Sequence, residues 1–343
     1  MAAKARALTH ATMQAVRFAR FGGPEVLELA EVRAPAAGDG EAVVRVEAAG
    51  VEPSDVKNVA GAFPDTTLPR VPGRAFAGTV VDGPAEWVGR RVWGTAGALG
   101  FGRDGAHAEF VRFPVAALGA RPLGLTPAQA ALVPVPFVTA WAGLVDGVGV
   151  RAGETVVVVG AAGGVGSAAV QLARWRGARV VGVVRRPLPD GLPAPARPDE
   201  LVRADLLGDA PGALGDAVRA LTDGRGADAG FDAVGGAELD RHLEALAPSG
   251  RMAIIAATGG RLATVDVLAF YRRGLRLVGV NSLAYDADAA ARVLEAVAPG
   301  FESGALAAPR VGQAFYLERA REAYEAVAAG GAGRVVLVPW RAT

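Results

Sequence analysis

The chain of 343 residues contains no cysteine. This absence excludes disulfides, thiol nucleophiles, iron–sulfur clusters and cysteine-ligated zinc sites. Histidine is also scarce, since only His10, His107 and His242 are present, and their wide spacing predicts no metal site. A formal charge of +1 with no basic tract gives neither nucleic acid nor a membrane surface an electrostatic partner. A small-molecule substrate is the remaining expectation.

Uninterrupted apolar segments are missing too. The run 155–173 is broken by four glycines and the run 122–145 by four prolines, so neither predicts a continuous lipid-facing helix. Residues 1–12 have two basic residues and no apolar core before Met13, which predicts a flexible extension and not a secretion signal. We therefore expect a cytoplasmic protein.

The remaining sequence has two parts that differ in their pattern of apolar residues. From residue 13 to about 115, short β-type runs alternate with Gly and Pro, which predicts a small barrel-like β domain. From residue 136, helical pattern alternates with Val-, Ile- and Ala-rich runs, which predicts a doubly wound parallel α/β sheet. Its strands are expected at 155–159, 179–184, 230–234, 251–256 and 275–280, and the proline-rich stretch 186–199 is interpreted as a surface loop.

The last part of the chain is expected to return to the β domain. Its pattern predicts a helix at 287–298, a strand at 310–314, a helix at 318–329 and a strand at 334–338. The predicted domains are therefore a β domain of residues 13–135 and 286–343 and an α/β domain of residues 136–285.

A glycine-rich loop joins the first α/β strand to a helix predicted over 164–176. Glycines permit a tight turn and close backbone approach, and a helix N-terminus offers free N–H groups to an anion. This context predicts a dinucleotide-phosphate site, the alternative being a structural turn. The loop residues are Gly160, Ala161, Ala162, Gly163, Gly164, Val165 and Gly166.

The end of the second strand predicts which dinucleotide binds. An acidic residue there favours NAD, whereas an arginine can pair with the additional phosphate of NADP. This chain has Arg185 and Arg186 and no acid until Asp190. We therefore expect NADPH, the alternative being two solvated arginines at the entry of a loop.

Several stretches carry a family resemblance. The order of a β domain, "GAAGGVGSAAVQLAR", "FDAVGG" and a terminal "GRVVLVP" resembles the medium-chain dehydrogenase/reductase superfamily, in particular its zinc-independent quinone oxidoreductase and enoyl reductase branch. The stretches "AAGVEPSDVKNVAG", "VPGRAFAGTVV" and "GAHAEFVRFP" follow the same order. The resemblance implies a GroES-like β-barrel domain, a Rossmann NADP-binding domain and a homodimer.

The zinc-binding motifs of that superfamily are altered here. Glu52 stands where the zinc branch has a cysteine, and Arg74 stands where it has the histidine of a G-H-E stretch. An arginine has no free lone pair for a metal. The resemblance thus implies zinc-free hydride transfer from NADPH to a quinone or to an activated alkene or carbonyl compound. The alternatives are an enoyl-thioester or enone reductase of a biosynthetic pathway, with Arg70, Arg74 and Arg103 as candidate carrier contacts, and an NADPH-binding protein with little turnover.

Individual site residues follow from the same resemblance. Lys57 is a candidate proton donor, the alternative being a surface lysine or a partner of Asp55, and Ser54 and Asp55 are expected to face the substrate cleft. His107 and Tyr271 are interpreted as structural residues. The remaining cofactor contacts implied are Thr139, Val234, Gly235, Ala256, Ala257, Thr258, Asn281, Ser282 and Arg334.

Overall fold

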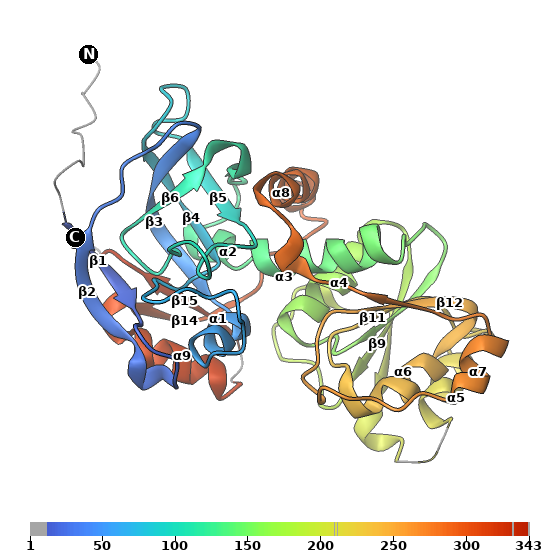
Figure 1. Cartoon of the computed structure of the whole chain (residues 1–343). Helices are drawn as coiled ribbons and strands as arrows, with labels where there is room; N and C mark the ends of the chain where they lie inside the picture. The colour runs from blue at the N-terminus through green and yellow to red at the C-terminus, as the bar shows by residue number, and fades with distance from the viewer. Residues whose placement is uncertain (1–11, 209, 211, 331–332, 342–343) are drawn as a thin grey trace. The chain divides into compact units, whose positions relative to one another are not determined.

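The computed structural model describes residues 12–208, 210, 212–330 and 333–341 (Figure 1). The predicted extension lies outside the described residues except for Thr12. Two compact units are present. The first unit comprises Met1–Val135, Leu283–Glu302 and Ala308–Thr343, and the second comprises Pro136–Ser282 and Ser303–Ala307.

The second unit is built on one six-stranded sheet. Its order is β10-β9-β8-β11-β12-β13, and every neighbouring pair is parallel. The sequence order reverses between β8 and β11, the place where a doubly wound sheet binds its ligand. The predicted doubly wound sheet is confirmed. The strands are β8 (Thr155–Val159), β9 (Arg179–Val184), β10 (Glu200–Arg203), β11 (Ala227–Asp232), β12 (Leu246–Ile254) and β13 (Arg276–Gly279).

One strand of this sheet has no counterpart in the sequence prediction. Strand β10 follows the proline-rich stretch directly and pairs with β9. Most residues of the stretch are exposed, as predicted for a surface loop, while Ala196 is buried and Pro198 packs beside Gly182. A four-residue edge strand with one buried side chain, Val202, has too little periodicity to be recognised from sequence.

Helices pack in two groups around the sheet (Figure 1). Helix α4 (Gly164–Trp175) packs with the π-helical segment η3 (Ala142–Gly147), which continues α3 (Pro134–Trp141), whereas α5 (Ala213–Ala220) packs with α6 (Leu239–Glu244). Among the described residues, one helical run, Pro127–Gly147, has the length and composition of a membrane span, but 78% of its most apolar window is buried inside the structure.

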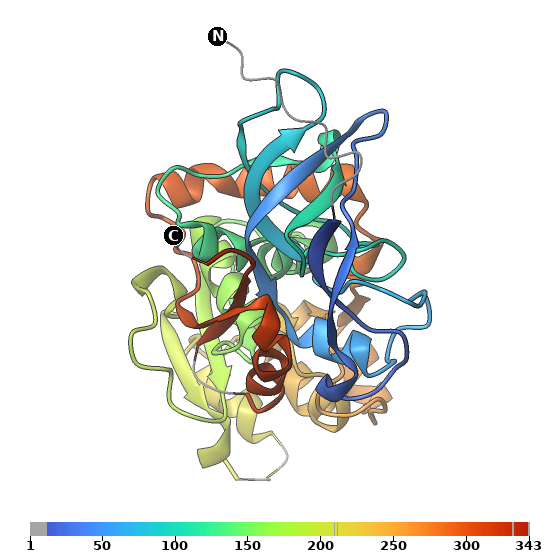
Figure 2. The same ribbon diagram turned by 90° about the vertical axis from the view of Figure 1, so that its left-hand side faces the viewer.

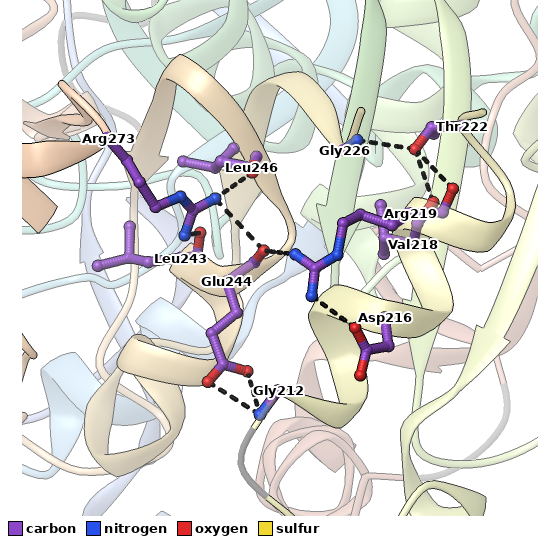
Figure 3. A network of polar contacts seen from close by, with 10 residues as sticks. All are labelled: Gly212, Asp216, Val218, Arg219, Thr222, Gly226, Leu243, Glu244, Leu246 and Arg273. Carbon is purple, nitrogen blue, oxygen red and sulfur yellow. Dashed lines mark hydrogen bonds and ion pairs between the residues drawn. The ribbon is translucent and has the colours of Figure 1, made fainter. Parts of the chain in front are cut away.

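A polar network closes the end of α6 (Figure 3). Arg219 of α5 and Arg273, which follows α7 (Val267–Arg272), each donate to the carbonyl oxygen of Glu244 at 3.4 Å. The Glu244 carboxylate accepts from the Gly212 amide at 3.1 Å. Burial and the nearby positive charge of Arg219 lower the pKa of Arg273. The network satisfies carbonyl groups that a helix C-terminus leaves unpaired, so it fixes three helices to one another.

The first unit is a mostly antiparallel β structure (Figure 2). Its main sheet has the order β14-β15-β3-β4-β5-β7, with β6 also paired to β3, and β1 (Thr12–Arg17) and β2 (Glu28–Arg33) form a separate pair. The predicted β domain is therefore confirmed, and the C-terminal strands β14 and β15 lie in its main sheet. The main strands are β3 (Glu41–Val51), β4 (Ala75–Asp82), β5 (Arg91–Thr95), β6 (Phe110–Pro114), β7 (Gly119–Ala120), β14 (Val311–Tyr316) and β15 (Arg334–Val338).

The core of the first unit lies between these strands and its helices. Phe76 and Phe113 meet edge to face at 5.1 Å among buried Val and Ala side chains. Buried and less buried residues alternate along β6, as expected of a strand with one buried face, whereas β3 is buried along most of its length. The helices of this unit are α1 (Pro53–Val59), α2 (Pro127–Ala131), α8 (Ala287–Glu302) and α9 (Ala320–Ala328).

Candidate functional site

The glycine loop of the second unit has the geometry of an anion cradle. Gly160 turns the chain after β8 with a φ of 80°, a conformation that favours glycine. A Cβ at Gly166 would overlap the Gly160 carbonyl oxygen, so only glycine allows this close approach. Helix α4 begins at Gly164, and no side chain caps its N-terminus.

The first-turn amides of α4 are therefore available to a ligand. The N–H groups of Gly164, Val165 and Gly166 have no intrahelical acceptor, and Gly163 before them is exposed. Such amides, together with the positive end of the helix dipole, stabilise phosphate oxygens. The residues present fit the pyrophosphate of a dinucleotide.

The loops after β11 and β12 converge beside Gly160. A Cβ at Gly160 would lie 3.3 Å from Val234 Cγ2. Thr258 Oγ1 donates to the Val234 carbonyl at 3.1 Å, and a Cβ at Gly235 would overlap the Ala256 carbonyl oxygen. The structure thus brings together the strand-end residues Val234, Gly235, Ala256, Ala257 and Thr258 that the sequence predicted.

A buried acid holds the loop after β11. Asp232 Oδ1 accepts from the amides of Val234 and Gly235 at 2.8 and 2.9 Å, and its Oδ2 lies 2.8 Å from His242 Nδ1. These hydrogen bonds and the nearby imidazole hold the pKa of Asp232 below its usual range against the opposing effect of burial. Sequence reasoning missed both side chains, although the Asp two residues before Val234 in "FDAVGG" was a local signal of a turn.

The two predicted phosphate-binding arginines lie next to the glycine loop. The Val183 carbonyl at the end of β9 accepts the Gly160 amide at 2.9 Å, so the chain leaves the sheet beside the loop. Arg185 and Arg186 follow directly and are exposed, with no hydrogen bond or ion pair to any described residue. Their guanidinium groups are free to meet a ligand.

The remaining predicted residues of the second unit stay predictions. Thr139 is buried in α3, Asn281 is exposed after β13, and Ser282 is partly buried. Asn281 and Ser282 follow the end of β13, and Thr139 lies within α3.

In the first unit, a buried polar cluster surrounds the start of α1. Arg334 Nη2 donates to Glu52 Oε2, and Asp55 Oδ2 accepts the Glu52 amide at 2.8 Å. Arg74 Nη1 donates to Ser54 Oγ at 3.0 Å. Burial raises the pKa of Asp55 to about 7, against the opposing effects of the Glu52 amide and the Arg74 charge, and burial lowers the pKa of Arg74.

A second buried chain of hydrogen bonds involves His107. Its Nε2 lies 3.0 Å from the Gly50 carbonyl, which can only accept, so Nε2 carries the proton. Nδ1 then accepts from the Tyr324 hydroxyl at 2.9 Å. Burial lowers the pKa of His107 to about 4 and raises that of Tyr324. The packed role predicted for His107 agrees with these contacts.

Other predicted residues have definite partners or exposure. Lys57 is exposed while Asp55 is buried, and no ion pair joins the two side chains. Arg70 pairs with Asp104 at 2.9 Å and Arg103 with Glu41 at 2.6 Å. Both arginines, like Arg74, therefore already have partners inside the unit.

No grouping of three or more His, Asp or Glu side chains suited to a metal ion exists among the described residues. Arg74 and the Arg334-bound Glu52 occupy the two altered motif positions. A guanidinium at one position and an ion-paired carboxylate at the other do not fit a zinc ion.

Comparisons with known proteins place these features in a family. Residues 38–122 match the alcohol dehydrogenase GroES-like domain, and residues 164–298 match the zinc-binding dehydrogenase domain. A zinc-type alcohol dehydrogenase-like protein of Schizosaccharomyces pombe is 35% identical over 303 residues, which cover 85% of this chain and 86% of that protein.

Two further similarities bear on the chemistry. The solved structure of a mycobacterial quinone oxidoreductase has a TM-score of 0.82 and 29% identity, and the match covers 95% of this chain and all of the other (100%). A phenolphthiocerol synthesis polyketide synthase of Mycobacterium bovis is 35% identical over 256 residues, which are 70% of this chain but 11% of that much longer protein.

Proposed function

This chain belongs to the medium-chain dehydrogenase/reductase superfamily and is an oxidoreductase, and we propose that it transfers hydride from NADPH, without zinc, to a quinone or to another activated alkene or carbonyl compound. The observation that carries the proposal is the pair of exposed, unpaired arginines, Arg185 and Arg186, beside the glycine loop. Similarity to a quinone oxidoreductase structure supports the acceptor class.

The chain's own residues would act by binding and orientation. The amides of Gly164–Gly166 would hold the pyrophosphate, and Arg185 and Arg186 the 2′-phosphate. The turn at Val234 and Gly235, held by Asp232, would shape the site at the strand ends. NADPH supplies the hydride when bound, so alignment with the acceptor is the main requirement on the protein.

Dissociation constants for NADPH and NADH test the cofactor assignment. An R185A/R186A variant should bind NADPH about 30-fold or more weakly, because each charged hydrogen bond to phosphate contributes about 1.5–3 kcal/mol. NADH binding should change less than about threefold. The matched control R225A/R272A removes two exposed arginines of the same unit and should change neither constant. Equal losses for the two dinucleotides would exclude the assignment.

Metal content and turnover test the zinc-free part of the proposal. The purified protein should hold far less than one zinc ion per chain, and NADPH oxidation with 1,4-benzoquinone or an enone should persist after dialysis against a chelator. Stoichiometric zinc, or activity lost on chelation and restored by zinc, would contradict it.

An enoyl thioester is the second candidate acceptor, favoured by the match to a polyketide synthase. Arg70 and Arg103, the expected contacts for its carrier, are already paired with Asp104 and Glu41, which counts against this acceptor. Comparing crotonyl thioesters with quinones in the same NADPH assay separates the two acceptors. Tight NADPH binding without turnover of either would favour the binding-protein alternative.

The proposal includes a cytoplasmic homodimer. Strand β13 is an edge of the six-stranded sheet, and the nearby Tyr271 and Leu277 are exposed. An unpaired edge with apolar neighbours favours pairing with a second chain. Light scattering should give twice the mass of 34.8 kDa, and a monomer would exclude the dimer.

A further inference from the structure

His242 of α6 and Asp232 at the end of β11 form a buried pair that the proposed hydride transfer does not use. They are 6% and 0% exposed, and His242 Nδ1 lies 2.8 Å from Asp232 Oδ2. Asp232 stands opposite Val159, the last residue of β8, and Gly160 of the glycine loop follows directly. The order of the sheet reverses between these two strands, which is where a doubly wound sheet binds its ligand. Asp232 therefore lies at the strand ends beside which the dinucleotide is expected.

The pair has a defined donor and a defined acceptor. Although burial opposes it, the pKa of Asp232 is held below its usual range, so the side chain is a carboxylate at neutral pH and can only accept hydrogen bonds. The proton between the two side chains therefore belongs to His242 Nδ1. The imidazole occupies Oδ2 and leaves Oδ1 to the amides of Val234 and Gly235, at 2.8 and 2.9 Å. His242 thus fixes the orientation of the carboxylate in which one oxygen meets both amides.

The loop that Asp232 holds is also fixed from its other side. The Val234 carbonyl accepts from Thr258 Oγ1 at 3.1 Å and from the Gly259 amide at 3.0 Å. The Val234 side chain lies against Gly160, since a Cβ built on that glycine would be 3.3 Å from Val234 Cγ2. A shift of this loop would therefore change the space beside the phosphate cradle.

The helix that carries His242 is a fixed support for the pair. Arg219 and Arg273 each donate at 3.4 Å to the carbonyl of Glu244, two residues after His242, so α6 is tied to α5 and to the end of α7 (Figure 3). Residues that are locked by packing and hydrogen bonds hold a binding site more precisely than loop residues do. An imidazole on this helix can therefore hold the loop after β11 in one place.

We propose that His242 is a positioning residue for the dinucleotide, which acts through Asp232 to hold the loop of Val234 and Gly235 in the geometry that admits the cofactor beside the glycine loop. The inference rests on the proposed function and goes beyond it, because His242 touches neither the reacting atoms nor the phosphates. It acts on the affinity for a nicotinamide dinucleotide and not on the hydride step.

The structure shared by the two dinucleotides gives this role a signature of its own. NADPH and NADH differ only in the 2′-phosphate, which the exposed Arg185 and Arg186 would contact. The loop held by Asp232 lies beside the phosphate cradle, which would hold the pyrophosphate common to both. Loss of the His242 donor should therefore weaken both dinucleotides by the same factor, whereas R185A/R186A should weaken NADPH alone.

Dissociation constants for NADPH and NADH test the role of His242. His242→Leu removes the donor, and both constants should rise about tenfold, because hydrogen bonds to charged groups are the strong ones. His242→Asn places an amide N–H where Nδ1 stands and should restore both constants to within about threefold of the wild type. In steady-state kinetics of His242→Leu, KM for NADPH should rise with the dissociation constant, while kcat with 1,4-benzoquinone changes less than about twofold.

A matched control separates positioning from stability. Thr222 is 6% exposed in the same unit, and its Oγ1 donates to the Val218 carbonyl at 2.8 Å and accepts the Gly226 amide at 2.9 Å (Figure 3). It lies just before the start of β11, at the opposite end of the strand from Asp232. Thr222→Val should lower the unfolding temperature without changing either dissociation constant. Wild-type constants in His242→Leu, or a loss confined to NADPH, would overturn the inference.

A second variant keeps the test decisive if His242→Leu does not fold. His242→Gln then takes its place, since its side-chain amide reaches beyond the position of Nδ1. It should bind both dinucleotides more weakly than His242→Asn does. Equal affinities in these two variants would overturn the inference.

Hydrogen exchange in the protein without cofactor separates this inference from the proposed function. By NMR, the amides of Val234 and Gly235 should exchange about tenfold faster in His242→Leu than in the wild type, and His242→Asn should restore their protection. Equal exchange would overturn the inference even if NADPH binds. A wild type that binds NADH as tightly as NADPH would refute the cofactor assignment, while equal weakening of both by His242→Leu would still support the role of His242. A wild type that binds neither dinucleotide would refute both.

Discussion

His242 Nδ1 lies 2.8 Å from Asp232 Oδ2, and the other carboxylate oxygen of Asp232 holds the amides of Val234 and Gly235. The pair links α6 to the end of β11, and both side chains are buried. The loop it holds lies against Gly160 of the predicted phosphate cradle. A contact between two buried side chains thus shapes the loop of the proposed cofactor site.

We predict that the contact between Asp232 and His242 makes a pH-dependent contribution to the free energy of unfolding. The pKa of Asp232 is depressed in the folded state, so its contribution is present above the ordinary value of 3.8 and is lost as pH falls through the lower folded value. Asp232→Asn should reduce the free energy of unfolding by about 1–3 kcal/mol at pH 7. The difference from wild type should shrink toward pH 3 in urea titrations. Asp223→Asn changes an acid outside this contact and serves as control; a deficit that is the same at both pH values would contradict the prediction.

For the contribution of Asp55 to stability we predict the opposite pH dependence. Its folded pKa of about 7 exceeds the ordinary 3.8, so its contribution to stability is lost as pH rises through that window. Asp55→Asn keeps an oxygen for the Glu52 amide and should be more stable than wild type at pH 8.5, by about 2–4 kcal/mol. At pH 4 the two proteins should converge. Denaturant titrations at both pH values measure this, and a variant less stable at pH 8.5 would show that the Asp55 charge is needed.

We predict that removing the Tyr324 hydroxyl has a purely structural effect. Tyr324→Phe leaves buried His107 Nδ1 without a donor and should reduce the free energy of unfolding by about 1–3 kcal/mol. The matched control is Tyr271→Phe, because Tyr271 is 61% exposed, and it should change stability by less than about 0.5 kcal/mol. Urea unfolding of both variants gives the comparison. Similar values for the two would mean that the His107 contact contributes nothing.

We predict that a substitution at Gly166 disrupts the proposed cofactor site locally. Gly166→Ala places a methyl group against the Gly160 carbonyl, so the loop must shift. We expect this shift to cost about 1–3 kcal/mol of free energy. NADPH affinity should fall at least about tenfold. Gly124→Ala adds the same methyl group where nothing lies within 4 Å and should bind NADPH normally. Unchanged affinity in Gly166→Ala would place the phosphates elsewhere.

Local pattern accounts for what could be predicted of the fold. The Val-rich segments at 155–159 and 179–184 coincide with β8 and β9, because strands buried on both faces are continuous apolar runs. The glycine loop was equally predictable, since its conformation depends on the residues within it. The short edge strand β10 was not, because its pairing with β9 is a tertiary contact.

By itself the sequence determined the two kinds of domain, and it predicted the phosphate cradle with its arginines and a site without zinc, all of which depend on residue type over short spans. Only the tertiary structure decided which distant side chains meet. Glu52 and Arg334 pair because β3 and β15 are antiparallel neighbours with Val51 opposite Val335. Arg74, directly before β4, likewise donates to Ser54 of α1. Such partners are determined by strand register and burial, and neither can be recognised from a local pattern in the sequence.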